Sequence, residues 1–155
     1  MTTSVKRSRI DRLRWASVVF ALLGSLVAGY LTYIKLAHVE AICRGVGDCE
    51  AVNSSIYSQI SGIPIAVLGL GAYLVILGLL ALETRVGGLR DYAPLGIFGL
   101  ALTGTLYSAY LTYVELFVIT AVCPYCVASA LIITTVLILS ILRLLRGLTG
   151  GKEAG

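Results

Sequence analysis

Charged residues are scarce in this sequence. They make up 13% of its 155 residues, whereas apolar residues make up 58%. Soluble domains average about 25% charged and about 45–50% apolar residues. A chain of this size with so few polar groups cannot cover a water-facing surface with them, which excludes an ordinary soluble domain and a disordered chain. The length excludes a large multidomain enzyme, so a small membrane protein with several spans remains.

Histidine, methionine and tryptophan each occur once, and the shortage of histidine is the informative one. A single imidazole excludes metal sites built on several histidines and a haem held between two histidines in the membrane. The sequence also lacks a glycine-rich phosphate loop after a strand, the mark of a nucleotide site. The four cysteines are therefore the residues on which chemistry would depend.

Four apolar stretches are long enough to cross a bilayer as helices, which takes about 20 mostly apolar residues. They run from about 15 to 36, 63 to 82, 93 to 122 and 124 to 145. We predict an all-α membrane protein: one integral-membrane domain over 1–155, a four-helix transmembrane bundle with one long extracytoplasmic loop at 37–62. The third stretch exceeds one span and should tilt or protrude. Glycines within the spans indicate close helix packing.

The basic residues are distributed unevenly between the two sides of this predicted bundle. Ten of the twelve lie on one side: Lys6, Arg7, Arg9, Arg12, Arg14, Arg85, Arg90, Arg143, Arg146 and Lys152. Because cytoplasmic segments carry the excess of Lys and Arg, we predict a multi-pass protein of the cell (plasma) membrane with both termini cytoplasmic. The 37–62 loop and the connection at 120–125 then face outward. The net charge of +4 reflects this topology and not a nucleic-acid partner.

All four cysteines fall on the predicted outer side, where oxidising conditions permit disulfides. Cys123 and Cys126 form a C-x-x-C motif that opens the fourth span. The free N–H groups and the dipole of a helix N-terminus favour a thiolate, which is the attacking species in thiol–disulfide exchange. The motif therefore predicts a redox-active pair. Cys123, which precedes Pro124, should be the more exposed member, with Cys126 one turn deeper.

Cys43 and Cys49 form a second pair in the long loop, separated by five residues that include two glycines. Such a segment can close a disulfide and can also swing toward the fixed pair, which predicts an electron relay by thiol–disulfide exchange. Two alternatives remain open. The cysteines could form two structural disulfides, or they could hold a metal ion, although the spacing of the loop pair suits zinc poorly.

A dithiol at the mouth of a membrane helix needs an oxidant, and a quinone dissolved in the bilayer is the simplest candidate. Tyrosines gather near the outer ends of the spans, where interfacial aromatic residues are common in any case. Tyr110 and Tyr113 are three residues apart and share a helical face that could line a quinone pocket. Ser55 and Ser61 are candidate hydrogen-bond donors to the quinone. Glu115 fits a solvated rim position better than a proton donor to the quinol.

The order of these features resembles the vitamin K epoxide reductase family and its prokaryotic homologues. A loop cysteine pair is followed by a serine, and a C-x-x-C motif opens the fourth of four spans. The matching segments are Gly29–Tyr33, Ala41–Cys43, Cys49 with Val52, Ser54 and Ser55, Gly62–Pro64, Leu68–Gly69, Tyr110–Leu111 and Cys123–Val127. The resemblance covers roughly residues 15–146. In the unrelated bacterial quinone-linked disulfide oxidases, the two cysteine pairs occur in the opposite order.

The resemblance implies a quinone-linked thiol oxidoreductase that supports disulfide-bond formation. Electrons would enter at Cys43 and Cys49 from a reduced thioredoxin-like protein and pass to the C-x-x-C pair by exchange of Cys49 with Cys123. Cys126 would then pass them to the quinone, which could be ubiquinone, menaquinone or a related naphthoquinone. Ser55 matches a family position near the quinone pocket, and Leu111, which lies in a matching segment, is a further pocket candidate.

Two departures from the family pattern affect what the resemblance implies. Many prokaryotic members carry a fused thioredoxin domain after a fifth span, whereas this sequence stops at residue 155. The thioredoxin-like partner is therefore expected to be a separate protein. The vertebrate enzymes have a tyrosine where Ala130 stands, which weakens an assignment as a quinone-epoxide reductase. That activity and a non-enzymatic membrane protein with two structural disulfides remain the alternatives.

Overall fold

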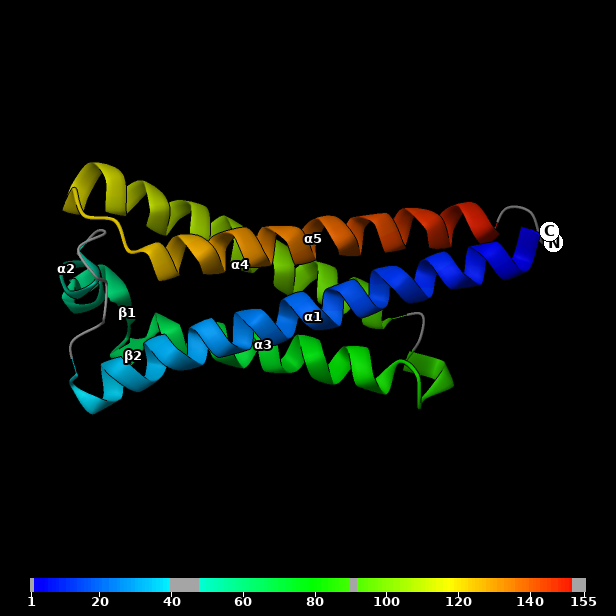
Figure 1. Ribbon diagram of the computed structural model, residues 1–155, viewed down its shortest axis with the longest axis horizontal. Coiled ribbons are helices and arrows are strands. Elements are labelled where there is room, and N and C mark those ends of the chain that lie inside the picture. Colours follow the sequence, from blue (N-terminus) through cyan, green and yellow to red (C-terminus); the bar gives the residue numbers. More distant parts are fainter. Residues whose placement is uncertain (1, 40–47, 90–91, 152–155) are drawn as a thin grey trace.

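The computed structural model describes residues 2–39, 48–89 and 92–151, and four long helices lying side by side dominate it (Figure 1). They are α1 (Thr2–Ala37), α3 (Ile65–Leu82), α4 (Ala93–Val114) and α5 (Pro124–Gly151). Within the described residues, four segments are long and apolar enough to cross a membrane: Asp11–Ala37, Ile65–Leu82, Ala93–Ile119 and Pro124–Gly147. The predicted all-α four-helix bundle is confirmed.

The two ends of this bundle differ in content. One end, here called the terminal end, holds the start of α1, the end of α5 and the short helix η2 (Gly87–Leu89) (Figure 1). The opposite end, here called the cysteine end, holds Cys49, Cys123 and Cys126. The start of α1, the end of α5 and η2 therefore lie at the same end of the bundle, opposite the cysteines.

Four short elements between α1 and α3 build most of the cysteine end. They are α2 (Cys49–Ser54), the 3₁₀ turn η1 (Ile56–Ser58) and the strands β1 (Gln59–Ile60) and β2 (Ile63–Pro64). The Asp48 carboxylate caps α2 by accepting the Ala51 N–H at 3.0 Å. The strands pair antiparallel, with Ile60 opposite Ile63. The turn between them places Ser61 and Gly62 at φ of 52° and 83°, in the left-handed region.

Prolines stand at the start of three long helices. Pro64 is the N-cap of α3, Pro94 lies in the first turn of α4, and Pro124 is the first residue of α5. A proline is tolerated there because the first N–H groups of a helix have no partner inside it. These prolines fix where the chain re-enters the bundle, and Pro124 does so directly after Cys123.

The core lies between α1, α3, α4 and α5 in the middle of the bundle. Its buried members are Ala21, Ala28, Tyr73, Ile76, Leu80, Ile97, Ala101, Ile133 and Val136. Glycines allow two of the helix contacts: a Cβ on Gly24 would meet the Tyr73 ring, and one on Gly104 would approach Ile133 Cγ1 to 3.0 Å. The predicted close packing at glycines is thus found at these positions, whereas Gly71 has open space around it.

A buried ion cluster joins three helices at the terminal end. Both oxygens of Glu83, at the end of α3, accept from the Arg143 guanidinium of α5 at 2.7 and 2.8 Å. Arg14 Nε of α1 lies 3.5 Å from the same carboxylate. The Glu83 and Arg143 side chains are 6% and 7% exposed. Charges buried to this degree persist only when they are paired, and here the pairing ties α1, α3 and α5 together.

The structure departs from the predicted element bounds in three places. The first helix begins at Thr2, well before the expected start of the span near residue 15. The third segment ends at Ile119 and not at 122, because the chain passes from α4 into the π-helical turn η3 (Glu115–Ile119). The β1–β2 hairpin was not expected at all. Helix α4 crosses α5 obliquely in Figure 1, which agrees with the tilt expected of a long third span.

Candidate functional site: a dithiol at the mouth of a pocket

The C-x-x-C motif occupies the boundary between the connection after η3 and helix α5. Cys123 immediately precedes the helix, and its carbonyl accepts the Val127 N–H at 3.1 Å. Cys126 lies in the first helical turn. Both carry free thiols, whereas Cys49 is disulfide-bonded. Cys43, the predicted partner of Cys49 in the loop pair, lies outside the described residues.

Cys123 is covered by the segment that carries Cys49. The two cysteines belong to one buried cluster with Leu31 and Ile34 of α1 and Val52 of α2. Cys123 is 1% exposed, while Cys126 is half-buried. The expectation that Cys123 would be the more exposed thiol was therefore wrong, because α1 and α2 dock on this side of the motif. The arrangement leaves Cys49 as a neighbour of Cys123.

The thiol of Cys123 is acidified by its surroundings. A hydrogen bond from the Cys126 thiol stabilises the Cys123 thiolate and, against the opposing effect of burial, lowers the pKa of Cys123 to about 7. The backbone N–H groups of Cys126 and Tyr125 add to this stabilisation, and the nearby Glu115 charge opposes it. These N–H groups belong to the first turn of α5, so the helix N-terminus supplies part of the effect.

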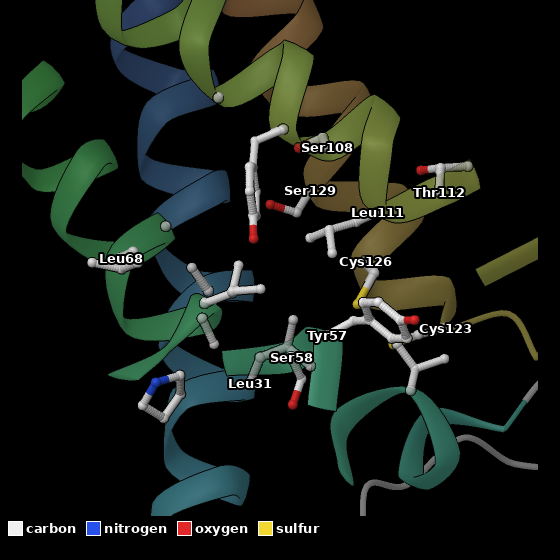
Figure 2. A pocket seen from close by; sticks show the side chains of 18 of the residues that line it. Leu31, Tyr57, Ser58, Leu68, Ser108, Leu111, Thr112, Cys123, Cys126 and Ser129 are labelled. Carbon is white, nitrogen blue, oxygen red and sulfur yellow. The ribbon is translucent and has the colours of Figure 1, made fainter. Parts of the chain in front are cut away.

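A pocket of about 370 Å³ opens beside the two thiols, within the range of about 300–1,000 Å³ common for small-molecule sites. Its wall is mostly apolar and includes residues of α1, α3, α4 and α5 and of the segment from α2 to β2. In Figure 2 the Cys126 sulfur points toward the space that these side chains enclose. Hydroxyl groups are spaced around the same wall, on Ser55, Tyr57, Ser58, Tyr107, Ser108, Thr112 and Ser129.

Glu115 is a buried member of this wall. Glu115 is only 3% exposed, and its Oε2 accepts the Cys123 N–H at 3.3 Å. The Cys126 thiol also lies where it can donate to this carboxylate. The expectation of a solvated rim position was therefore wrong, because η3 turns this residue inward onto the cysteine pair. Among the described residues, no three His, Cys, Asp or Glu side chains are grouped so that they could hold a metal ion.

A model of the vitamin K epoxide reductase family matches residues 15–141, most of the chain. The protein belongs to this family. Thiol-disulfide oxidoreductase LTO1 from Arabidopsis thaliana is 31% identical over 123 residues. The match covers 75% of this chain but only 32% of the relative, so the chain spans about a third of that protein's length. Family membership and the relative's name both support an oxidoreductase.

Two of the predicted quinone-pocket residues line the pocket of this vitamin K epoxide reductase family member. They are Leu111, on α4, and Ser55, which follows α2. The Ser55 hydroxyl donates to the Val52 carbonyl at 2.8 Å. This bond uses the hydroxyl proton of Ser55, so Ser55 could donate to a quinone only if the bond to Val52 opened.

The other three candidates do not reach the pocket. Tyr110 and Tyr113 are 49% and 58% exposed on the outer face of α4, and Ser61 lies in the exposed hairpin turn. Tyr110 and Tyr113 do share a helical face, as predicted, but it is the face turned away from the pocket. Leu111 and Thr112 lie on the inner face instead.

Sequence reasoning missed a tyrosine–serine contact on the pocket wall. The Tyr73 hydroxyl donates to the Ser129 carbonyl at 3.0 Å and lies 3.3 Å from the Ser129 Oγ. Two signals could have found it. Tyr73 is the only residue with a polar side chain between Ile65 and Leu82, and a buried tyrosine hydroxyl normally has a partner. Ser129 follows Cys126 by three residues and so lies on the same face of α5.

Proposed function

We propose that this protein is a membrane thiol oxidoreductase that moves electrons from an extracytoplasmic thioredoxin-like protein to a membrane quinone. One observation carries the proposal: a free dithiol lies between a covering segment that bears a second, disulfide-bonded cysteine and an apolar pocket. Cys123 contacts the cluster containing Cys49, and Cys126 opens onto the pocket. Cys123 thus lies close to Cys49, and both cysteines of the motif line the pocket.

Electrons enter through the loop pair. A thioredoxin-like dithiol reduces the disulfide of Cys43 and Cys49, and the Cys49 thiolate then attacks oxidised Cys123. The bond between Cys123 and Cys126 breaks, and Cys126 leaves. Attack of Cys43 on Cys49 completes the transfer and releases Cys123, so that two electrons and two protons have moved to the helix pair. Burial of Cys49 and Cys123 in one cluster supports this order of exchange.

Electrons leave through the pocket beside Cys126. The pocket size, its apolar wall and its scattered hydroxyl groups suit a quinone ring, whose two carbonyl oxygens accept hydrogen bonds. A bound quinone supplies the two-electron acceptor. Leu111 and Ser55 would contact it, while the Cys126 sulfur faces it. The disulfide between Cys123 and Cys126 re-forms as the electrons leave.

The sidedness and the partner follow from charge and compartment. The excess of Lys and Arg at the terminal end supports a cytoplasmic location for that end and an extracytoplasmic location for the cysteine end in the plasma membrane. Disulfide exchange at the cysteine end then takes place in the extracytoplasmic compartment, where conditions are oxidising and a thioredoxin-like oxidase can act. The relative's name, thiol-disulfide oxidoreductase, supports the same chemistry. A separate thioredoxin-like oxidase is proposed as the electron donor.

The experiment is a quinone-reduction assay on the purified protein in lipid nanodiscs, with dithiothreitol or a thioredoxin-like protein as donor and a short-chain quinone as acceptor. Wild-type protein should form quinol, and Cys126→Ala should form none above background. Thr135→Ala is the matched control: it removes a hydroxyl of the same helix that donates to the Leu131 carbonyl and does not line the pocket, and it should keep wild-type activity. Wild-type protein that consumes thiols without forming quinol would contradict the proposal. A second arm with a quinone epoxide tests the alternative substrate.

A further inference from the structure

The Glu115 carboxylate occupies a position that the cysteine relay alone does not require. Its Oε2 accepts the Cys123 N–H at 3.3 Å, and the Cys126 thiol donates to the same carboxylate. The Cys126 thiol also donates to the Cys123 sulfur. Because a thiol carries a single proton, Cys126 can donate it either to the other sulfur or to the carboxylate. Both Glu115 and Cys126 line the pocket.

No cation neutralises this carboxylate among the residues that the structure describes. The ion pairs found there all involve Glu83 at the terminal end. Burying a carboxylate without a cation is strongly unfavourable unless hydrogen bonds compensate for the lost hydration. Glu115 has the hydrogen bonds, and they come from the reacting pair itself.

The backbone around Glu115 is shaped to bring it to the cysteines. The π-helical turn η3 widens the end of α4, and π-turns inside helices occur frequently at functional sites. The Glu115 carbonyl accepts the N–H groups of Thr120 and Ala121, the latter at 3.1 Å. Thr120 has φ of 53°, a left-handed conformation that is rare for a β-branched residue. Such conformations persist where the surrounding structure holds them, often at active sites.

We propose that Glu115 is a catalytic proton carrier: it takes the proton of the Cys126 thiol as the helix pair closes to a disulfide and delivers it to the reduced quinone. The inference rests on the proposed function and adds the route of the proton. As the bond between Cys123 and Cys126 forms, the S–H bond of Cys126 breaks and two electrons pass to the quinone. Glu115 gives its proton to one quinol oxygen. The second proton comes from water and replaces the one that Cys123 released when it ionised.

Few ionisable groups face Glu115. From the start of α5 and the residue before it, they are the thiols of Cys126 and Cys123. From α2, Cys49 is disulfide-bonded and does not titrate, and the side chain of Glu50 lies outside the described residues. The pH dependence of quinone reduction should therefore report the two thiols and this carboxyl, and replacing Glu115 should remove one ionisation from the profile.

The test compares Glu115→Gln with Glu83→Gln, the same change at a second buried glutamate. Pre-reduced protein is mixed with a short-chain quinone in one turnover, and quinol formation is followed across pH. Glu115→Gln should slow this step by about 10²–10⁴-fold, the usual contribution of a positioned acid or base, and lose one ionisation. Glu83→Gln should keep the wild-type rate per folded molecule.

A second readout needs no quinone. The S–H stretching band in the infrared spectrum of reduced protein should move to higher frequency in Glu115→Gln, because a thiol bonded to a carboxylate has a weakened S–H bond. Glu115→Asp keeps a carboxyl and should retain the full pH profile at a reduced rate. This variant provides the test if Glu115→Gln does not fold. Wild-type rates and an unmoved S–H band in Glu115→Gln would overturn the role of Glu115. Failure of wild-type protein to reduce quinone would instead overturn the proposed function.

Discussion

Among the side chains that the structure describes, two glutamates are buried at opposite ends of the bundle, and their surroundings differ. Glu83, at the terminal end, is bonded through both oxygens to Arg143, and Arg14 completes the cluster. Glu115, at the cysteine end, is bonded to a backbone N–H and to the Cys126 thiol, with no arginine or lysine paired to it among the described residues. Burial is thus shared, but the partners of the two carboxylates are not.

The difference separates a carboxylate that holds helices from one that can exchange a proton. A buried ion pair with three helices attached fixes positions, and removing one partner leaves the other charge buried and unpaired. A carboxylate bonded to a thiol shares a proton with a reacting atom. The comparison therefore predicts that substitutions at the terminal end affect stability more than electron transfer. Substitutions at the cysteine end should affect electron transfer more than stability.

The largest expected effect on stability is that of Glu83→Ala. It should lower the free energy of unfolding by about 3–5 kcal/mol, because Arg143 stays buried without a partner. Asp11→Ala, at an exposed carboxylate of the same end, is the matched control and should change little. Thermal unfolding in detergent gives the measurement. The double variant Glu83→Leu with Arg143→Met should recover much of the lost stability. A Glu83→Ala protein as stable as wild type would contradict the structural role of this cluster.

A smaller effect, felt on both stability and activity, is expected of Gly24→Ala in the middle of the bundle. The new methyl group would meet the Tyr73 ring, which cannot withdraw freely because its hydroxyl is bonded to Ser129. Overpacking of this kind costs about 1–3 kcal/mol, and it also displaces a pocket residue, so quinone reduction should fall. Gly71→Ala, with open space around it, is the control and should be neutral or slightly stabilising. Equal results for the two variants would contradict this packing.

The smallest effect is a shift in a titration at the cysteine end. The pKa of Cys123 is lowered to about 7, so its thiolate forms as pH rises through about 7 and is lost below it. Ultraviolet absorbance of the thiolate in reduced protein should show this midpoint, and Cys123→Ser should remove it. In Cys126→Ala the midpoint should move upward toward about 8.5, because the donor to the thiolate is gone. An unchanged midpoint in that variant would show that Cys126 does not acidify its neighbour.

The sequence allowed the bundle and the redox pair to be predicted, since both depend on local signals. The four apolar runs predict the helices, and Cys123 next to Pro124 predicts a thiol at a helix start. The inward face of α4 could not be predicted in this way. A helix that is apolar all round gives no amphipathic signal, so Tyr110 and Tyr113 could be assigned to one face but not to the pocket.

The burial of Cys123 and Glu115 depends on contacts between distant segments. Cys123 is covered because α2, more than 65 residues earlier in the chain, docks against it. Glu115 turns inward because α4 continues into η3 rather than ending at the rim. Neither event has a periodic signature in the sequence. Both are tertiary effects: the sequence had led us to expect an exposed Cys123 thiol and a solvated Glu115 at the rim, and the structure buries both.

The most direct test of the central claim, a relay from Cys49 to Cys123, is to trap the disulfide that links the two pairs. In Cys43→Ala, Cys49 has no partner with which to re-form a disulfide, so quinone-oxidised protein should accumulate the bond between Cys49 and Cys123. Non-reducing digestion and mass spectrometry would show the cross-linked peptides, and Cys49→Ala is the matched control that should show none. The account predicts the Cys49–Cys123 peptide. A Cys43–Cys123 peptide in wild type, or no link between the pairs in Cys43→Ala, would contradict it.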